Sequence, residues 1–372
     1  MDRETEAPIL EDRLFARGLI SAGHGDALAR FRKKLERKEA ITYAAIGGSI
    51  TQGAAASDDK RTAYGPRFTA WLNQHTACSF INAGVGATTS MFGAFRAQQE
   101  MLCQAPDIIT VEFAVNDTIN PDIEASYEAL VRQCVESPAK PLVILIFTMR
   151  REGTNLQDKH IPIGKHYGLP MLSYRDALYP EITVGKLAWR PLSPDEVHPN
   201  DRGHAFIAGM LEYYIEHAKA LEGIQTLPEL LHPGAVKYLG GSVIDASRMD
   251  LLKNLGWHQY DHGQGYIGYE SDKPGASLRV KIKGGTLLIG YVKYAGDFGR
   301  VSVKVNGNKF CELDGFYEKP EIQQWAGGHT VLAALADAPA GTEHLVDIEL
   351  LDMRHPRSHG QRFRIGYFLA AQ

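Results

Sequence analysis

Short apolar runs alternate with amphipathic stretches along the chain as far as residue 220. The runs are rich in β-branched residues and too short for buried helices, so they predict strands buried on both faces of a parallel sheet. The predicted strands cover residues 41–46, 78–81, 108–113, 142–147 and 171–173. Helical spacing of apolar residues marks stretches around residues 28–35, 68–75, 91–102, 127–134 and 205–220. This alternation predicts an α/β fold with right-handed crossovers and helices on both faces of the sheet.

The pattern changes after a proline-containing connector at residues 223–234. Apolar and polar positions then alternate with a period of two. Examples are residues 278–282, 301–305 and 346–350. Short strands with Gly-rich turns predict an all-β sandwich of the jelly-roll type. We therefore predict an α/β domain at residues 1–227 and a β-sandwich domain at residues 236–372.

Two dipeptides mark turns in this second region. Asn306-Gly307 predicts a tight hairpin, because both residues tolerate positive φ angles. Gly284-Gly285 predicts a second turn.

Charge and composition narrow the choice of partners. The chain has 372 residues, with 40 Lys and Arg against 44 Asp and Glu, and a formal net charge of −4. A nucleic-acid binder usually shows a basic face, so we expect no nucleic-acid partner. The longest aliphatic and aromatic run, residues 142–147, is far shorter than the ~20 residues that span a bilayer, so we expect no membrane partner.

The N-terminal segment and the cysteines indicate a location. Residues 1–13 carry acidic side chains and lack the apolar core of an export signal. The cysteines have none of the short spacings of a metal site or a secreted disulfide framework. They are Cys78, Cys103, Cys134 and Cys311. We therefore expect reduced thiols in a cytoplasmic protein.

Candidate chemistry begins with Ser49, in the segment Gly47-Gly48-Ser49-Ile50-Thr51 directly after the first predicted strand. Open α/β sheets place their ligands at the carboxyl ends of strands, and the small neighbours leave the hydroxyl open. The segment is not the GxSxG elbow of α/β-hydrolases, because Thr51 stands in place of the last glycine. Taken alone the signal is weak, since Gly240-Gly241-Ser242 in the β region has the same composition.

Asp195 and His198 lie just before the last predicted helix. A spacing of three lets the carboxylate accept from Nδ1–H and leaves Nε2 to take a proton from a serine. Two further strand ends offer hydrogen-bond donors to an oxyanion: the glycine loop at residues 82–88 and the side-chain amide of Asn116. Each segment alone is typical of a strand-end turn, whereas together with Ser49 they predict acyl transfer.

From about Ala40 to His217 the chain resembles the SGNH (GDSL-like) hydrolase superfamily. The resemblance implies a flavodoxin-like three-layer α/β/α domain that hydrolyses esters through an acyl-enzyme and needs no cofactor. Ser49 would be the nucleophile, with Asp195 and His198 as its partners.

The oxyanion hole implied by the resemblance takes Ser49, Asn116 and either Gly86 or Ala87. The chain departs from the superfamily pattern at three positions. Gly48 replaces the Asp of GDS, Ala114 replaces the Gly of GxND, and Ala87 aligns with the usual last glycine of the glycine loop.

A narrower resemblance rests on GGSIT, NAGVGATTS and EFAVND together with a C-terminal β domain. The arrangement is similar to carbohydrate esterase family seventeen. It implies removal of O-acetyl groups from mannooligosaccharides and a second domain that acts as a carbohydrate-binding module over the catalytic cleft. The candidate substrate contacts are Asp117, Trp189, Arg190, Tyr317 and Trp325. For the tryptophans, packing in a core is an equally good interpretation.

Alternative functions stay open. A short-chain esterase or lysophospholipase would need an acyl tunnel, and the sequence shows no amphipathic lid to feed one. A non-catalytic carbohydrate binder would not need the full Ser, Asn, Asp and His set. Acetylated xylan- or pectin-derived oligosaccharides remain possible substrates, and the sequence leaves open whether the chain forms a homo-oligomer.

We expect no metal ion in the site. His355 and His359 lie near Asp352 with almost the spacing of metal ligands, but three arginines among them repel a cation. The group His258, Asp261 and His262 is discounted in the same way, and a structural calcium in the β domain stays open.

Overall fold

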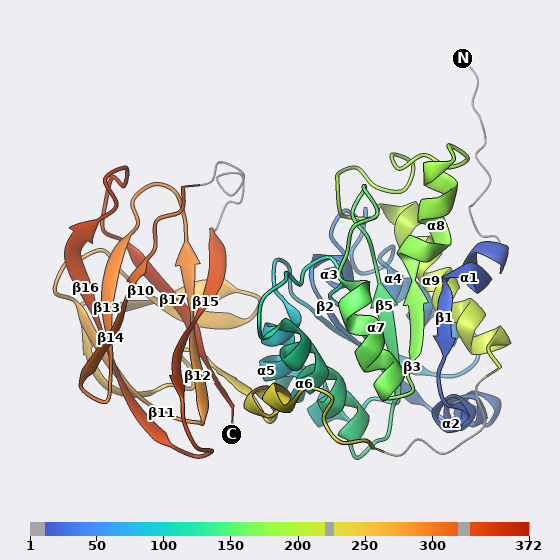
Figure 1. Cartoon of the computed structure of the whole chain (residues 1–372), viewed down its shortest axis with the longest axis horizontal. Coiled ribbons are helices and arrows are strands. Elements are labelled where there is room, and N and C mark those ends of the chain that lie inside the picture. Colours follow the sequence, from blue (N-terminus) through green and yellow to red (C-terminus); the bar gives the residue numbers. More distant parts are fainter. Residues whose placement is uncertain (1–11, 220–226, 319–327, 372) are drawn as a thin grey trace. The chain divides into compact units, whose positions relative to one another are not determined.

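The computed structural model describes residues 12–219, 227–318 and 328–371 (Figure 1). It divides into two compact units, Met1–Val236 and Lys237–Gln372. No helix in the described ranges is both long and apolar enough to cross a membrane.

Helices and strands alternate through the first unit. The α-helices are α1 (Asp12–Gly18), α2 (Gly25–Glu36), α3 (Ser49–Gln52), α4 (Tyr64–Leu72), α5 (Ser90–Glu100), α6 (Ile123–Glu136), α7 (Gln157–His166), α8 (Tyr174–Thr183) and α9 (Asp201–His217). Short 3₁₀ helices lie at η1 (Leu102–Gln104) and η2 (Pro233–Tyr238). The strands are β1 (Leu19–Ala22), β2 (Ile41–Gly47), β3 (Cys78–Gly84), β4 (Ile108–Glu112), β5 (Leu142–Phe147) and β6 (Pro170–Ser173).

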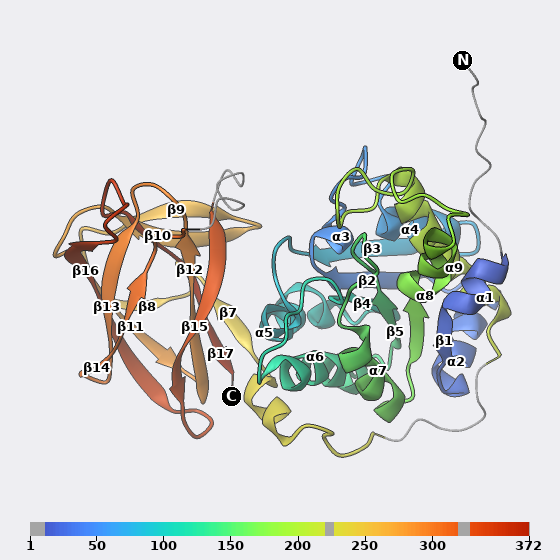
Figure 2. The same cartoon turned by 45° about the horizontal axis from the view of Figure 1, so that its top comes forward.

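These strands form one six-stranded sheet in the order β1-β6-β5-β4-β2-β3. All neighbouring pairs are parallel except β1, which runs antiparallel along β6. Helices α1, α2, α4, α8 and α9 share an apolar cluster with one face of the sheet, and α5, α6 and α7 lie on the other face (Figure 2). The prediction of a three-layer α/β/α unit is therefore confirmed.

Burial explains which elements the sequence revealed. Every residue of β4 and β5 is buried, because helices cover both faces of the sheet, and both strands read as continuous apolar runs. Strand β1 was not predicted, since its four residues are only half-buried at the sheet edge. Helices α7 and α8 were also not predicted, since each contains an internal proline, Pro162 and Pro180, that weakens a helical pattern.

The second unit consists of antiparallel strands. They are β7 (Ser242–Ile244), β8 (Asp250–Leu255), β9 (His258–Gly263), β10 (Tyr266–Ser271), β11 (Ser277–Lys283), β12 (Thr286–Lys293), β13 (Gly299–Val305), β14 (Asn308–Asp314), β15 (His329–Asp337), β16 (Glu343–Arg354) and β17 (Phe363–Ala371). One sheet has the order β15-β12-β17-β10-β9, with β7 paired to β17, and the other has the order β14-β13-β16-β11-β8. The predicted all-β sandwich is confirmed.

The two predicted turns differ in what they connect. Asn306 and Gly307 have φ angles of 52° and 81° and join β13 to β14 as a hairpin, in which Val305 pairs with Asn308. Gly284-Gly285 instead leads from β11 in one sheet to β12 in the other. Gly284-Gly285 therefore connects the two sheets of the sandwich and does not form a hairpin.

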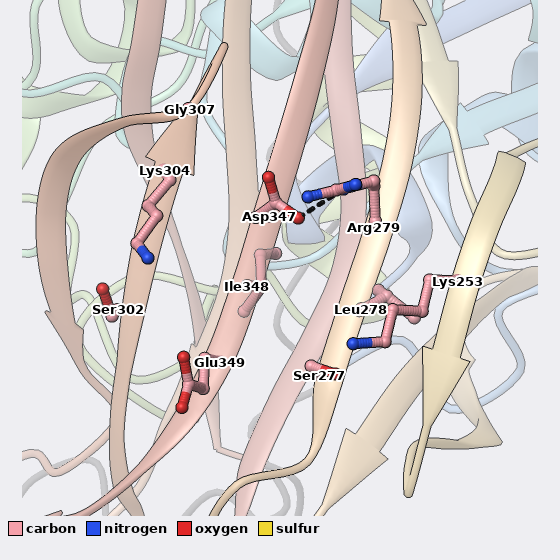
Figure 3. A pocket seen from close by; sticks show the side chains of 10 residues that line it. All are labelled: Lys253, Ser277, Leu278, Arg279, Ser302, Lys304, Gly307, Asp347, Ile348 and Glu349. Atoms are coloured by element: carbon pink, nitrogen blue, oxygen red, sulfur yellow. Dashed lines mark hydrogen bonds and ion pairs between the residues drawn. The ribbon is translucent and has the colours of Figure 1, made fainter.

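A shallow hollow of about 310 Å³ lies on β8, β11, β13 and β16, with the turn between β13 and β14 at one end (Figure 3). It is lined by Lys253, Ser277, Leu278, Arg279, Ser302, Lys304, Gly307, Asp347, Ile348 and Glu349. Arg279 Nε donates to Asp347 Oδ1 at 2.6 Å. No aromatic side chain lines the hollow, so it lacks the flat apolar surface on which sugar rings stack.

A buried carboxyl group lies under the first unit's serine segment. Glu112 ends β4 with its side chain fully buried. It accepts hydrogen bonds from Thr148 Oγ1 at 2.5 Å and from Thr51 Oγ1 at 3.4 Å. Burial raises the pKa of Glu112 to about 7, and the two hydroxyl donors lower it by less. Ionising this group in the folded protein is therefore unfavourable.

We expect Glu112→Gln to change how stability depends on pH. The folded pKa of about 7 lies above the ordinary value of 4.5, so stabilisation by the bound proton is complete below pH 4.5 and is lost as pH rises to 7. The difference corresponds to about 3 kcal/mol. Urea unfolding of the first unit at several pH values should show this loss for the wild type and not for Glu112→Gln. Glu216→Gln, on the exposed side of α9, is the control. A wild-type pH dependence in Glu112→Gln would contradict the prediction.

Candidate active site

Three loops meet at the carboxyl end of the parallel sheet. β2 lies between β3 and β4, so the chain segments that leave these three strands emerge side by side. Ser49 begins α3 just after β2, and the glycine loop and Asn116 follow β3 and β4. This is the edge at which open α/β sheets bind their ligands.

The structure brings Ser49, His198 and Asp195 together in a continuous hydrogen-bonded row. Ser49 Oγ lies 2.9 Å from His198 Nε2, and His198 Nδ1 lies 2.8 Å from Asp195 Oδ2. The His198 and Asp195 side chains are 30% and 48% exposed, so the row is open to solvent along one side. In this geometry the imidazole can accept the serine proton through Nε2.

Local hydrogen bonds fix the carboxylate of Asp195 in place. Its Oδ1 accepts from the backbone N–H groups of Val197 and His198, both at 2.7 Å. Partial burial by itself raises the pKa of Asp195, but the hydrogen bonds from His198 and Val197 outweigh it and hold the pKa below its ordinary value. Asp195 is therefore ionised where it faces the imidazole.

Three side chains support the loop that carries Asp195 and His198. Trp189 Nε1 donates to Asp195 O at 2.6 Å, and Ser193 Oγ donates to His198 O at 2.6 Å. Asn200 caps α9 by accepting from Arg202 N–H and Gly203 N–H. The roles of Ser193 and Asn200 were missed, because each depends on contacts that a single sequence does not reveal.

The predicted substrate contacts fall in different environments. Trp189 is buried in the core of the first unit, and Arg190 is exposed, with its guanidinium donating to Pro194 O at 2.9 Å. Asp117 is buried beneath the site, where it accepts from Ser90 N–H at 2.8 Å. Tyr317 is half-buried in the second unit with Lys293 Nζ 5.9 Å from its ring centroid. Trp325 lies outside the described residues.

Asn116 lies directly against the serine segment. A Cβ atom built on Gly48 would come within 2.3–2.6 Å of the side-chain amide atoms of Asn116. Such contacts are too short for any side chain, so the present place of the Asn116 amide requires glycine at position 48. A side chain at position 48 would therefore have to displace the Asn116 amide.

Gly86 and Ala87 present their N–H groups differently. Gly86 N–H donates to Gln52 Oε1 at 3.0 Å, and a Cβ built on Gly86 would lie 3.7 Å from Ser49 Cβ. Ala87 is exposed with a φ of 58°, the left-handed region in which glycine is favoured. Neither Ala87 N–H nor Ser49 N–H has a backbone or side-chain acceptor among the described residues.

The histidines discounted as metal ligands have other partners. His355 Nε2 lies 2.8 Å from Glu318 Oε1, His258 pairs with Glu270, and Tyr260 lies 2.7 Å from His262. Within the described ranges, no group of three or more His, Cys, Asp or Glu side chains has the geometry of a metal site.

Comparisons with known proteins identify the fold of the first unit and of the whole chain. Residues 45–206 match the model of the GDSL-like Lipase/Acylhydrolase family. A search of curated proteins finds no match. Two solved structures of a two-domain esterase (CEX) active on acetylated mannans, one co-crystallised with mannopentaose, are similar from end to end. They have TM-scores of 0.83 and 0.84 at 26% identity, over 96% of this chain and 97% and 98% of theirs.

The resemblance to the SGNH (GDSL-like) superfamily predicted from the serine, glycine, asparagine and DxxH segments is thus confirmed. All four segments lie within the matched residues. Residues 45–206 are thus similar to the GDSL-like Lipase/Acylhydrolase family, and the protein is a carboxylic ester hydrolase.

Proposed function

We propose that the protein is a serine acetylesterase that removes O-acetyl groups from mannooligosaccharides. The single observation that carries the substrate class is the end-to-end likeness to CEX, which includes the second unit. The hydrogen-bonded row of Ser49, His198 and Asp195 supports the serine mechanism.

The first half-reaction forms an acetyl-enzyme. Ser49 Oγ attacks the ester carbonyl carbon while His198 Nε2 accepts the hydroxyl proton. Asp195 holds the imidazole in the required tautomer and stabilises the imidazolium. The imidazolium then protonates the departing sugar oxygen, the ester bond breaks, and the acetyl group stays on Ser49.

The second half-reaction restores the enzyme. A water molecule loses a proton to His198 Nε2 and attacks the acetyl carbonyl. Acetate leaves, and Ser49 Oγ regains its proton from the imidazolium.

The oxyanion is held by three donors: Ser49 N–H, Ala87 N–H and the Asn116 amide. We choose Ala87 over Gly86 because Gln52 already accepts from Gly86 N–H. Preorganised donors of this kind stabilise developing charge without reorganisation at the moment of reaction.

The second unit is proposed to help bind the oligosaccharide. Its charged hollow on β8, β11, β13 and β16 lacks aromatic side chains. The proposal therefore rests on the likeness of the whole chain to CEX and on Tyr317 as one aromatic candidate.

Removing the members of the Ser–His–Asp row should abolish turnover while the fold is kept. Ser49→Ala and His198→Ala should each lower kcat for 4-nitrophenyl acetate by about 10⁴-fold or more, and Asp195→Asn by ~10²–10⁴-fold through the wrong tautomer. Circular dichroism should show unchanged secondary structure. Ser242→Ala, in the other Gly-Gly-Ser segment, is the control and should keep wild-type kinetics. Appreciable turnover by Ser49→Ala would refute the mechanism.

Disturbing Asn116 should lower kcat more than it raises KM. Asn116→Ala should lose ~10²–10³-fold in kcat, as for one oxyanion donor. Gly48→Ala should lose activity as well, because its Cβ would displace the Asn116 amide. Gly185→Ala is the control: no atom lies within 4 Å of its new Cβ, although its φ of 73° strains an alanine, whereas Gly48 has a φ of −87°. Equal kcat values for Gly48→Ala and Gly185→Ala would rule out this role of Gly48.

The substrate proposal is tested by acetate release from acetylated manno-, xylo- and pectic oligosaccharides. We expect the highest kcat/KM on acetylated mannooligosaccharides, with mass spectrometry following which acetyl groups disappear. A preference for xylo- or pectic substrates would support the acetylesterase activity but contradict mannooligosaccharides as its substrates. Cleavage of 4-nitrophenyl acetate alone would exclude an acetylated glycan substrate.

A further inference from the structure

Arg96, on α5, is the largest fully buried side chain in the described part of the protein and is not used by the mechanism above. Its guanidinium lies 5.5 Å from the ring centroid of Phe92 and forms a short ion pair with Glu100 one turn along α5. Burying a cation is costly unless it is hydrogen-bonded and paired, so its partners are informative.

Those partners are the carbonyl groups at the ends of two strands. Arg96 Nη1 donates to Ala83 O at 2.6 Å, and Nη2 donates to Gly47 O at 3.0 Å. Gly47 O also accepts from Val85 N–H at 3.0 Å. One guanidinium therefore joins the end of β2, the end of β3 and helix α5.

The place of these bonds matters because the parallel ladder ends there. β2 and β3 pair from Ile41 with Cys78 to Gly47 with Gly84, and no pair follows. Beyond that point the chains separate into the nucleophile segment and the glycine loop. Gly47 lies two residues before Ser49, and Ala83 lies four residues before Ala87.

We propose that Arg96 is a positioning residue that sets the distance between Ser49 and the Ala87 N–H of the oxyanion hole. The inference rests on the proposed roles of Ser49 and Ala87. Arg96 acts through the two carbonyl groups and touches neither substrate nor the reacting atoms. A small displacement of a reacting group costs up to about 10²-fold in rate, which is the scale expected here.

The test compares Arg96→Met and Arg96→Lys with the wild type. Met keeps the length and removes every donor, whereas Lys keeps the charge and can reach one carbonyl. We expect kcat for 4-nitrophenyl acetate to fall ~10–10²-fold in Arg96→Met, with KM changed by less than about 3-fold. The kcat of Arg96→Lys should lie between those of Arg96→Met and the wild type. The inhibition constant of methylboronic acid, which adds to a serine as a tetrahedral mimic, should rise in proportion to the loss of kcat.

Arg32→Met is the matched control. Arg32 also donates from its guanidinium to two backbone carbonyls, Ile215 O at 2.7 Å and Ala218 O at 3.0 Å, at the far end of α9. The Arg32→Met variant should have a lower melting temperature than the wild type and an unchanged kcat. If Arg96 has a purely structural role, Arg96→Met will behave like Arg32→Met, with wild-type kcat in the folded fraction and an unchanged inhibition constant for the boronic acid. That result would overturn the inference.

If Arg96→Met does not fold, the same measurements of kcat, KM and the boronic acid inhibition constant on Arg96→Lys test the inference. Activity in Ser49→Ala would overturn the proposed function itself. An inactive Ser49→Ala beside a fully active Arg96→Met would overturn only the role of Arg96.

Discussion

Close approach of backbones at one edge of the parallel sheet is the constraint on which the site depends. A Cβ built on Gly47 would lie 2.6 Å from Glu112 O, and one built on Gly84 would lie 2.2 Å from Gln52 N. The segments after β2 and β3 therefore pack with no space for side chains at these points. Because these segments are in contact, Ser49 and the glycine loop can both approach the carbonyl group of one bound ester. Asn116, which follows β4, lies against the same segments at Gly48.

Polar groups beneath this edge hold the loops from below. Thr51 forms hydrogen bonds with Tyr64 and with the buried Glu112. The Gly86 N–H donates to Gln52, and Arg96 donates to the carbonyl groups at the ends of β2 and β3. Buried polar groups that are paired in this way make an arrangement specific, because moving one loop leaves a buried donor or acceptor unsatisfied. The loops are thus set by interactions on the side away from solvent.

The sequence could predict the elements whose burial is complete and the residues whose spacing is local. Strands β4 and β5 are apolar throughout, and Asp195 and His198 interact within a single turn, so both were predictable. Long-range support could not be predicted. Trp189 is six residues from its acceptor and Arg96 is 49 residues from Gly47, with no pattern that pairs them. The crossover at Gly284-Gly285 was likewise hidden, since a glycine pair fits a hairpin and a sheet change equally well.

The serine mechanism is tested most directly by finding the residue that carries the acyl group during turnover. The enzyme would be mixed rapidly with an acetylated mannooligosaccharide, quenched in acid, digested and mapped by mass spectrometry. The serine mechanism predicts an acetyl group on Ser49 that appears before the steady state and disappears as substrate is consumed. Acetylation of another residue such as Ser242, or steady turnover with Ser49 never acetylated, would contradict it.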